Sequence, residues 1–130
     1  MTANINDIPK EILIGILKEF KRVIKEGGVM SHFIGMSDHF AHFDKSINIY
    51  NFLKFSDRVW SIIDNSIQPQ NRFRFKDYMN IYKQLGLPVT DKEYTEGDIE
   101  ELMKISLDNK YESYNAQELA ISHVYLISKM

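Results

Sequence analysis

Three histidines gather in one short stretch and could bind a metal ion. His32, His39 and His42 each precede a phenylalanine, and Asp38 comes directly before His39. On one continuous helix, steps of seven and three residues would place the three imidazoles within about 80 degrees of arc. Imidazole and carboxylate groups are ligands for zinc, iron and other divalent ions. One hypothesis is therefore a metal-dependent enzyme or sensor with a divalent metal as its cofactor.

The same spacing has a structural explanation, which we favour. Phe33, Phe40 and Phe43 necessarily share the spacing of the histidines, so a core stripe of phenylalanines would leave the imidazoles beside it. The H-x-x-H spacing is also weaker than the H-x-x-x-H pair of helical metal sites, and Gly35 and Ser37 weaken a helix here. We therefore expect structural histidines and no cofactor.

A second stretch alternates cations with aromatic rings in a way that suits single-stranded nucleic acid. It consists of Arg72, Phe73, Arg74, Phe75 and Lys76. Rings can stack on bases while cations contact phosphates. The chain as a whole carries a formal net charge of -2 and has no second basic stretch of this density, whereas nucleic-acid-binding domains usually carry a basic patch or stripe. Nucleic acid is thus a second alternative, and we expect phenylalanines that enter the core.

A third stretch, residues 91 to 101, is acidic and could attract a basic partner. Lys92 is its only cation, and the six carboxylates in it are those of Asp91, Glu93, Glu96, Asp98, Glu100 and Glu101. Clustered like charge steers association and orients a partner. A solvated loop and helix start would have the same composition. We take these six residues as the candidate partner-binding surface.

Sequence motifs typical of several enzyme classes are missing. The chain has no G-x-S-x-G, no phosphate-binding loop, no G-x-G-x-x-G and no H-E-x-x-H, which are signatures of hydrolases, nucleotide-binding enzymes and metalloproteases. It also has no cysteine, so thiol catalysis and thiolate metal sites are excluded. We therefore expect a binding protein rather than an enzyme.

The composition predicts a single globular domain over residues 1–130. The hydrophobic fraction of 44% and the charged fraction of 26% are ordinary for a folded protein, and a chain of this length can bury a core without disulfides. The first residues show no signal-peptide pattern, and no apolar run is long enough to span a membrane. We expect a soluble, cytoplasmic protein without membrane association.

Helical periodicity dominates the chain. Apolar residues recur every three or four positions between residues 8 and 24, with Asp7 placed to cap this helix, Pro9 in its first turn and Gly27 and Gly28 after it. Similar patterns predict a short helix after the glycine pair, a longer one over residues 47–67, and one over residues 75–85 that ends at Gly86.

Two capping signatures predict further helices. Thr95 with Asp98 and Asn115 with Glu118 each precede a short apolar pattern. We therefore predict an all-α fold of five to six helices. Residues 72–76 and 120–128 also alternate as strands do, so the alternative is an α+β fold with a small sheet from these two segments.

These patterns together favour a small intracellular protein-binding domain. An acidic surface, the small size and the missing catalytic motifs suit an immunity protein or inhibitor of a basic toxin such as a nuclease. The expected partner is a basic protein.

Overall fold

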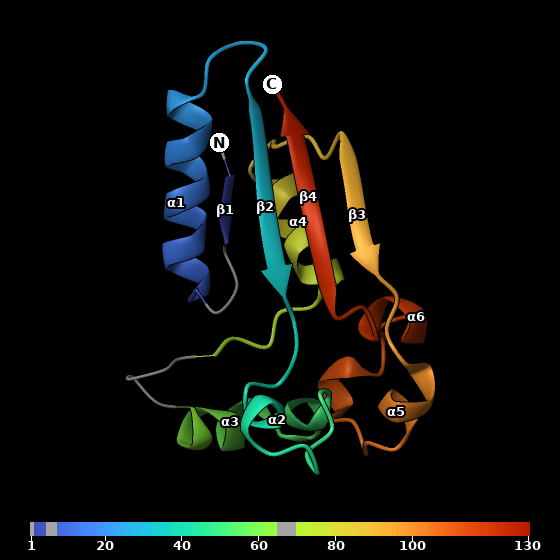
Figure 1. The fold of residues 1–130 in the computed structure, drawn as a ribbon. Helices are drawn as coiled ribbons and strands as arrows, with labels where there is room; N and C mark the ends of the chain where they lie inside the picture. The colour runs from blue at the N-terminus through green and yellow to red at the C-terminus, as the bar shows by residue number, and fades with distance from the viewer. Residues whose placement is uncertain (1, 5–7, 65–69) are drawn as a thin grey trace.

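The computed structural model describes residues 2–4, 8–64 and 70–130 (Figure 1). Its centre is a sheet of four strands, in the spatial order β1-β2-β4-β3. β1 pairs with β2 in parallel, whereas β4 is antiparallel to both β2 and β3. The strand bounds are β1 (Thr2–Asn4), β2 (Val29–Gly35), β3 (Asp91–Thr95) and β4 (His123–Lys129).

Helices surround this sheet on one face and at one end. In the described part of the chain they are α1 (Lys10–Val23), α2 (Phe40–Phe43), α3 (Asp57–Ile63), α4 (Phe75–Gln84), α5 (Ile99–Met103), α6 (Ala116–Leu119) and two 3-10 turns, η1 (Asn51–Lys54) and η2 (Asn109–Tyr111).

The all-α prediction is wrong, because a sheet forms the centre of the molecule. The short helix expected after the glycine pair is largely replaced by β2, and only Phe40–Phe43 is helical. The α+β alternative holds for one of its two segments. β4 lies where residues 120–128 were expected to form a strand, but residues 72–74 form no strand and Phe75 begins α4.

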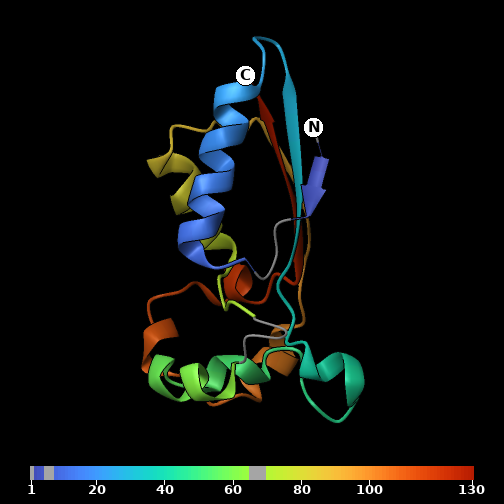
Figure 2. The same ribbon diagram turned by 90° about the vertical axis from the view of Figure 1, so that its left-hand side faces the viewer.

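The larger core lies between the sheet and two helices. Met30 and Ile34 of β2 and Val124 and Leu126 of β4 point to the same side, where α1 and α4 cover them (Figure 2). Leu13 and Leu17 from α1 and Tyr78, Ile81 and Tyr82 from α4 complete this core. The apolar side chains on every second residue of the strands thus pack against the apolar stripes of the two helices, which recur every 3.6 residues.

The first helix is confirmed, with small differences at its ends. Lys10 begins the helix directly after Pro9, which suits a helix start because proline lacks an N–H group. Val23 ends it before the glycines, and Gly27 adopts a φ of 77° in the turn to β2. The predicted cap Asp7 lies outside the described residues.

A second, smaller core lies at the end of the sheet where β2 leaves it. It contains Tyr50, Phe52, Leu53, Trp60, Leu102, Tyr111, Leu119 and Ala120. The long helix predicted over residues 47–67 is wrong for residues 47–64, and the remainder of this range lies outside the described residues. The chain forms η1 and then α3, whose start is capped by Ser56 accepting from the Val59 backbone at 3.2 Å.

Two later predictions agree with the structure, and a third is wrong in part, because Thr95 ends β3 and does not cap the following helix. The stripe over residues 75–85 forms α4, and Gly86 follows it with a φ of 66°. Asp98, rather than Thr95, caps α5, and Asn115 caps α6 by accepting from the N–H groups of Gln117 and Glu118. Among the described residues, no helix combines the length and the apolar character that a membrane span requires.

Candidate partner-binding surface

The six predicted acidic residues lie on the edge strand of the sheet and in the segment that follows it. Asp91 and Glu93 belong to β3, every residue of which is exposed. Their Cα partners on β4 are Ile127 and Tyr125. Because paired residues share a face, these two carboxylates project from the sheet face opposite α1 and α4.

The other four carboxylates surround the start of α5. Asp98 accepts from the Glu101 backbone N–H at 3.2 Å as the cap of this helix. Glu101 forms an ion pair with Lys104 and accepts from Asn48 at 3.1 Å, so it is already partly neutralised. Glu96 and Glu100 are exposed and have no ion pair or side-chain hydrogen bond within the described residues. Of these four residues, Glu96 and Glu100 therefore carry the least compensated charge.

A cleft of about 320 Å³ opens beside these residues, between the end of β3 and α6. We call it the acidic cleft, and it is lined by Tyr94, Glu96, Gly97, Ile99, Asn115, Gln117, Glu118 and Ile121. Tyr94 is 49% exposed and Ile99 38% exposed, so an aromatic and an aliphatic side chain are available next to Glu96 and Glu118. Glu118, like Glu96, has no cationic partner among the described residues.

One buried tyrosine holds the backbone segments beside the acidic cleft together. The hydroxyl of Tyr50 donates to the carbonyl oxygen of Ala120 at 2.6 Å and accepts from the N–H of Asp98 at 3.1 Å. This pair of bonds joins the segment after β3 to the segment before β4. Gly97 lies in the same place, where a Cβ would overlap the carbonyl of Ala120 and the Tyr50 hydroxyl. Only glycine allows this approach.

A band of aromatic side chains lies on the open face, by which we mean the sheet face not covered by α1 and α4. Phe33 stacks on His123 with ring centroids 5.7 Å apart, and its centroid lies 4.9 Å from that of Tyr125. Tyr125 is 44% exposed. Tyr94 lines both the acidic cleft and the shallow depression around these rings. It pairs with Val124, and its ring centroid lies 6.2 Å from that of Phe75, so its side chain is on the sheet side covered by α4. The acidic cleft and the aromatic band therefore meet at β3 from different sides.

The structure separates the histidines that the sequence placed on one helix. His32 is in β2 and is completely buried between Phe20 and Tyr82, with its Nδ1 2.6 Å from the Tyr82 hydroxyl. Burial lowers the pKa of His32 to about 4, so the imidazole is neutral.

His39 and His42 do lie together, with ring centroids 5.8 Å apart. Asp38 is buried beside them, and its carboxylate accepts from the Phe40 backbone at 2.9 Å. Burial raises the pKa of Asp38 above its ordinary value. Within the described residues, no three or more His, Cys, Asp or Glu side chains form a group that could hold a metal ion.

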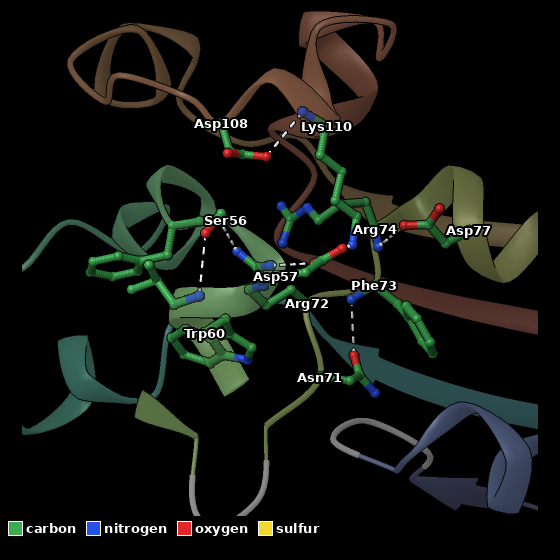
Figure 3. A network of polar contacts seen from close by, with 12 residues as sticks. Ser56, Asp57, Trp60, Asn71, Arg72, Phe73, Arg74, Asp77, Asp108 and Lys110 are labelled. Carbon is green, nitrogen blue, oxygen red and sulfur yellow. Dashed lines mark hydrogen bonds and ion pairs between the residues drawn. The ribbon is translucent and has the colours of Figure 1, made fainter. Parts of the chain in front are cut away.

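The basic and aromatic stretch points inward rather than outward (Figure 3). Arg72 is buried, donates to the carbonyl oxygens of Phe52 and Phe55, and forms an ion pair with Asp57 at 2.7 Å. Lys110 binds the same carboxylate at 2.8 Å, and its hydrogen bond lowers the pKa of Asp57. The Arg72 guanidinium also lies 5.3 Å from the Trp60 ring centroid.

Arg74 is buried even more completely. Its guanidinium donates to the carbonyl oxygens of Met36, Leu119 and Ile121, and its backbone N–H to Asp77 at 2.8 Å. Burial lowers the pKa of Arg74 to about 10, which still leaves it cationic at neutral pH. It therefore joins the end of β2 to the segment that leads into β4.

The aromatic members of this stretch also pack inside the molecule. Phe75 is buried in the larger core and Phe73 packs against it. Lys76 lies 4.9 Å from the Tyr114 ring centroid. The two arginines thus contact backbone carbonyls and Asp57, which leaves neither guanidinium exposed for phosphate.

Sequence reasoning found the exposed carboxylates but missed the residues that shape a site around them. Asn115, Gln117 and Glu118 come from the start of α6 and its cap, about fifteen positions after the acidic stretch, and Tyr50 comes from much earlier. The capping signature at Asn115 predicted a helix start, but no local signal places that helix next to β3. Only the pairing of β3 with β4 brings them together.

Comparison with known proteins finds no match: no protein-family model fits the sequence, and neither a curated protein nor a solved structure is similar to it. A proposed function therefore depends on the geometry of the described residues.

Proposed function

We propose that this chain is a protein-binding domain whose acidic surface binds a basic protein, in the manner of an inhibitor or immunity protein that occupies a basic toxin. The acidic surface comprises Asp91, Glu93, Glu96, Asp98, Glu100 and Glu101, together with the acidic cleft. The observation that carries the proposal is this cleft, in which two carboxylates without cationic partners border exposed aromatic and aliphatic side chains.

The lining of the acidic cleft suits a lysine or arginine side chain of the partner. Such a side chain has an apolar stem and a charged end. The stem can lie along Tyr94 and Ile99, where the tyrosine ring also favours a cation near its face. The charged end then reaches Glu96 or Glu118, and charge-assisted hydrogen bonds of this kind are stronger than neutral ones.

The surrounding carboxylates supply long-range attraction. Asp91, Glu93 and Glu100 are exposed, and of the acidic surface only Glu101 has an ion pair among the described residues. Exposed like charges raise the association rate with a partner of opposite charge, and this contribution falls as salt screens it. The same charges repel the phosphates of a nucleic acid, which favours a basic protein as the partner.

The test is capture from a native lysate followed by a measured affinity. Tagged protein should retain a basic protein in stoichiometric amount at low salt, with the affinity falling as salt is raised. In the double variant Glu96→Gln and Glu118→Gln, the affinity should fall by about tenfold or more. The matched control is Glu11→Gln with Glu26→Gln, which removes the same charge from exposed positions outside the acidic surface.

Two results would refute the proposal. One is a captured partner whose affinity is reduced equally by both double variants, since net charge alone would then explain the effect. The other is the absence of any basic partner at low salt, with the folded protein confirmed by circular dichroism.

A further inference from the structure

The open face of the sheet combines apolar side chains and acids in a regular order. Across the three strands β2, β4 and β3, one row runs Phe33, Tyr125, Glu93 and the next runs Ser31, Ile127, Asp91. Each row therefore ends on a carboxylate at the β3 edge. The face has an aromatic and aliphatic centre with an acidic margin at β3, and His123 and Lys129 lie at the two ends of β4 on the same face.

No helix of the described chain covers this face. Figure 2 shows α1 and α4 together on one side of the sheet and the long strands bare on the other. Tyr125 is 44% exposed, although its cross-strand neighbour Phe33 packs against it. Contiguous exposed apolar side chains rimmed by polar residues are typical of protein interaction sites.

The dimensions and charges of the face specify what would fit it. α1 has 14 residues and follows the strands on the covered face, so a helix of about the same length would follow β2 and β4 on the other. Its apolar stripe would contact Phe33, Tyr125 and Ile127. The residues beside that stripe would face Asp91 and Glu93, which favours lysine and arginine there.

We propose that an amphipathic helix of the basic partner docks on the open face, with its apolar stripe on Phe33, Tyr125 and Ile127 and its cations facing Asp91 and Glu93. This inference rests on the proposed function, because the same partner would place a basic side chain in the acidic cleft. The two contacts meet at β3, where Glu93 lies on the open face and the side chain of Tyr94 lies on the other side, in the acidic cleft.

The probe for this inference is a synthetic 14-residue peptide with leucines on one helical face and lysines on the other, labelled with fluorescein. A peptide of the same composition in scrambled order controls for charge alone. Fluorescence anisotropy should show that the amphipathic peptide binds at least tenfold more tightly. Its binding should shift the backbone NMR signals of β2 and β4.

Variants then identify the face. Phe33→Thr with Tyr125→Thr should weaken peptide binding at least tenfold, and threonine suits these strand positions, so the fold should be retained. The matched control is Phe43→Ser with Ile62→Gln, which removes two exposed apolar side chains from α2 and α3. Peptide binding should be unchanged in that control.

Failure of this inference can be told apart from failure of the proposed function. If the captured partner loses affinity in the Glu96→Gln and Glu118→Gln variant but not in the Phe33→Thr and Tyr125→Thr variant, the proposed function stands and helix docking is wrong. Equal binding of both peptides, or no peptide binding, also overturns it. Two further results would overturn helix docking. One is dimerisation of the wild type in analytical ultracentrifugation that is lost in the Phe33→Thr and Tyr125→Thr variant. The other is binding of a dT15 oligonucleotide that is lost in the same variant.

Discussion

The Nδ1 atom of His32 lies 2.6 Å from the hydroxyl oxygen of Tyr82, and neither side chain reaches solvent. The two come from β2 and α4 and so join the sheet to a helix that covers it. Burial lowers the pKa of His32 to about 4 and raises that of Tyr82. Both side chains are therefore neutral in the folded protein at physiological pH.

This pair predicts a loss of stability in mild acid. The unfolded chain binds a proton at His32 near pH 6.5, whereas the folded protein binds it only near pH 4. Because the unfolded state binds more protons between these values, the free energy of unfolding decreases as pH falls through this window. The contribution of His32 should reach about 3 kcal/mol at pH 4.

Urea unfolding of the wild type and of His32→Gln between pH 7 and pH 4 measures this contribution. The variant should be less stable at pH 7 but should show a smaller further loss on acidification. The control for the loss of an imidazole is His42→Gln, at an exposed position. An identical slope in His32→Gln would show that the buried imidazole is not responsible.

The buried hydrogen bonds of Arg74 should contribute strongly to the stability of the protein, whether or not a binding partner is present. Changing it to methionine keeps the volume similar but removes the donors to three buried carbonyl oxygens, those of Met36, Leu119 and Ile121. Each unpaired carbonyl costs about 1 to 3 kcal/mol, so we expect a total loss of about 4 kcal/mol. Arg58→Met, at an exposed position on α3, should change stability by less than about 0.5 kcal/mol. Equal stabilities of the two variants would contradict the assignment.

Alanine substitutions at two glycines should change the free energy of unfolding in opposite directions. Alanine at Gly97 would overlap Ala120 and Tyr50, so Gly97→Ala should lower the unfolding free energy by about 2 kcal/mol or more. Alanine at Gly15, in the middle of α1, meets no atom within 4 Å and should raise it by about 0.5 to 1 kcal/mol. Thermal unfolding of both variants against the wild type provides the measurement. A stabilised Gly97→Ala would show that the Gly97 turn can relax.

The capping of α6 by Asn115 should affect both the stability of the protein and the binding of the basic partner. Its side chain accepts from the N–H groups of Gln117 and Glu118, two residues of the acidic cleft. Asn115→Ala should therefore lower stability by about 1 kcal/mol and weaken capture of the basic partner. Asn80→Ala, at an exposed position on α4, should change neither. Unchanged capture by a destabilised Asn115→Ala would mean that α6 does not shape the binding site.

The helices with one strongly apolar face were the part of the fold that the sequence could predict. α1 and α4 each show one apolar stripe, and their positions were anticipated to within a few residues. β2 was missed because its two faces both contain apolar residues. Met30 and Ile34 face the core while Val29 and Phe33 face the other way, so the hydrophobic alternation that indicates a strand is obscured.

β3 could not be predicted for a different reason. All five of its residues are exposed, and its sequence, DKEYT, resembles a solvated loop. Backbone pairing with β4 holds it in place, and that pairing depends on residues about thirty positions later. The acidic residues could be named from the sequence. The cleft beside them could not, because Tyr94, Ile99 and Glu118 meet only in the folded chain.

The position of β4 between β2 and β3 also affects how the chain folds. Val29 pairs with Lys129 and Gly35 with His123, so the central pairing of the sheet joins residues that are far apart in the sequence. Contacts between such distant residues require a large loop to close before they stabilise the protein, and proteins rich in them fold slowly. Until β4 inserts, the hydrogen-bonding edges of β2 and β3 remain unpaired. The charged residues of β3 then protect one of these edges from intermolecular pairing during the slow step.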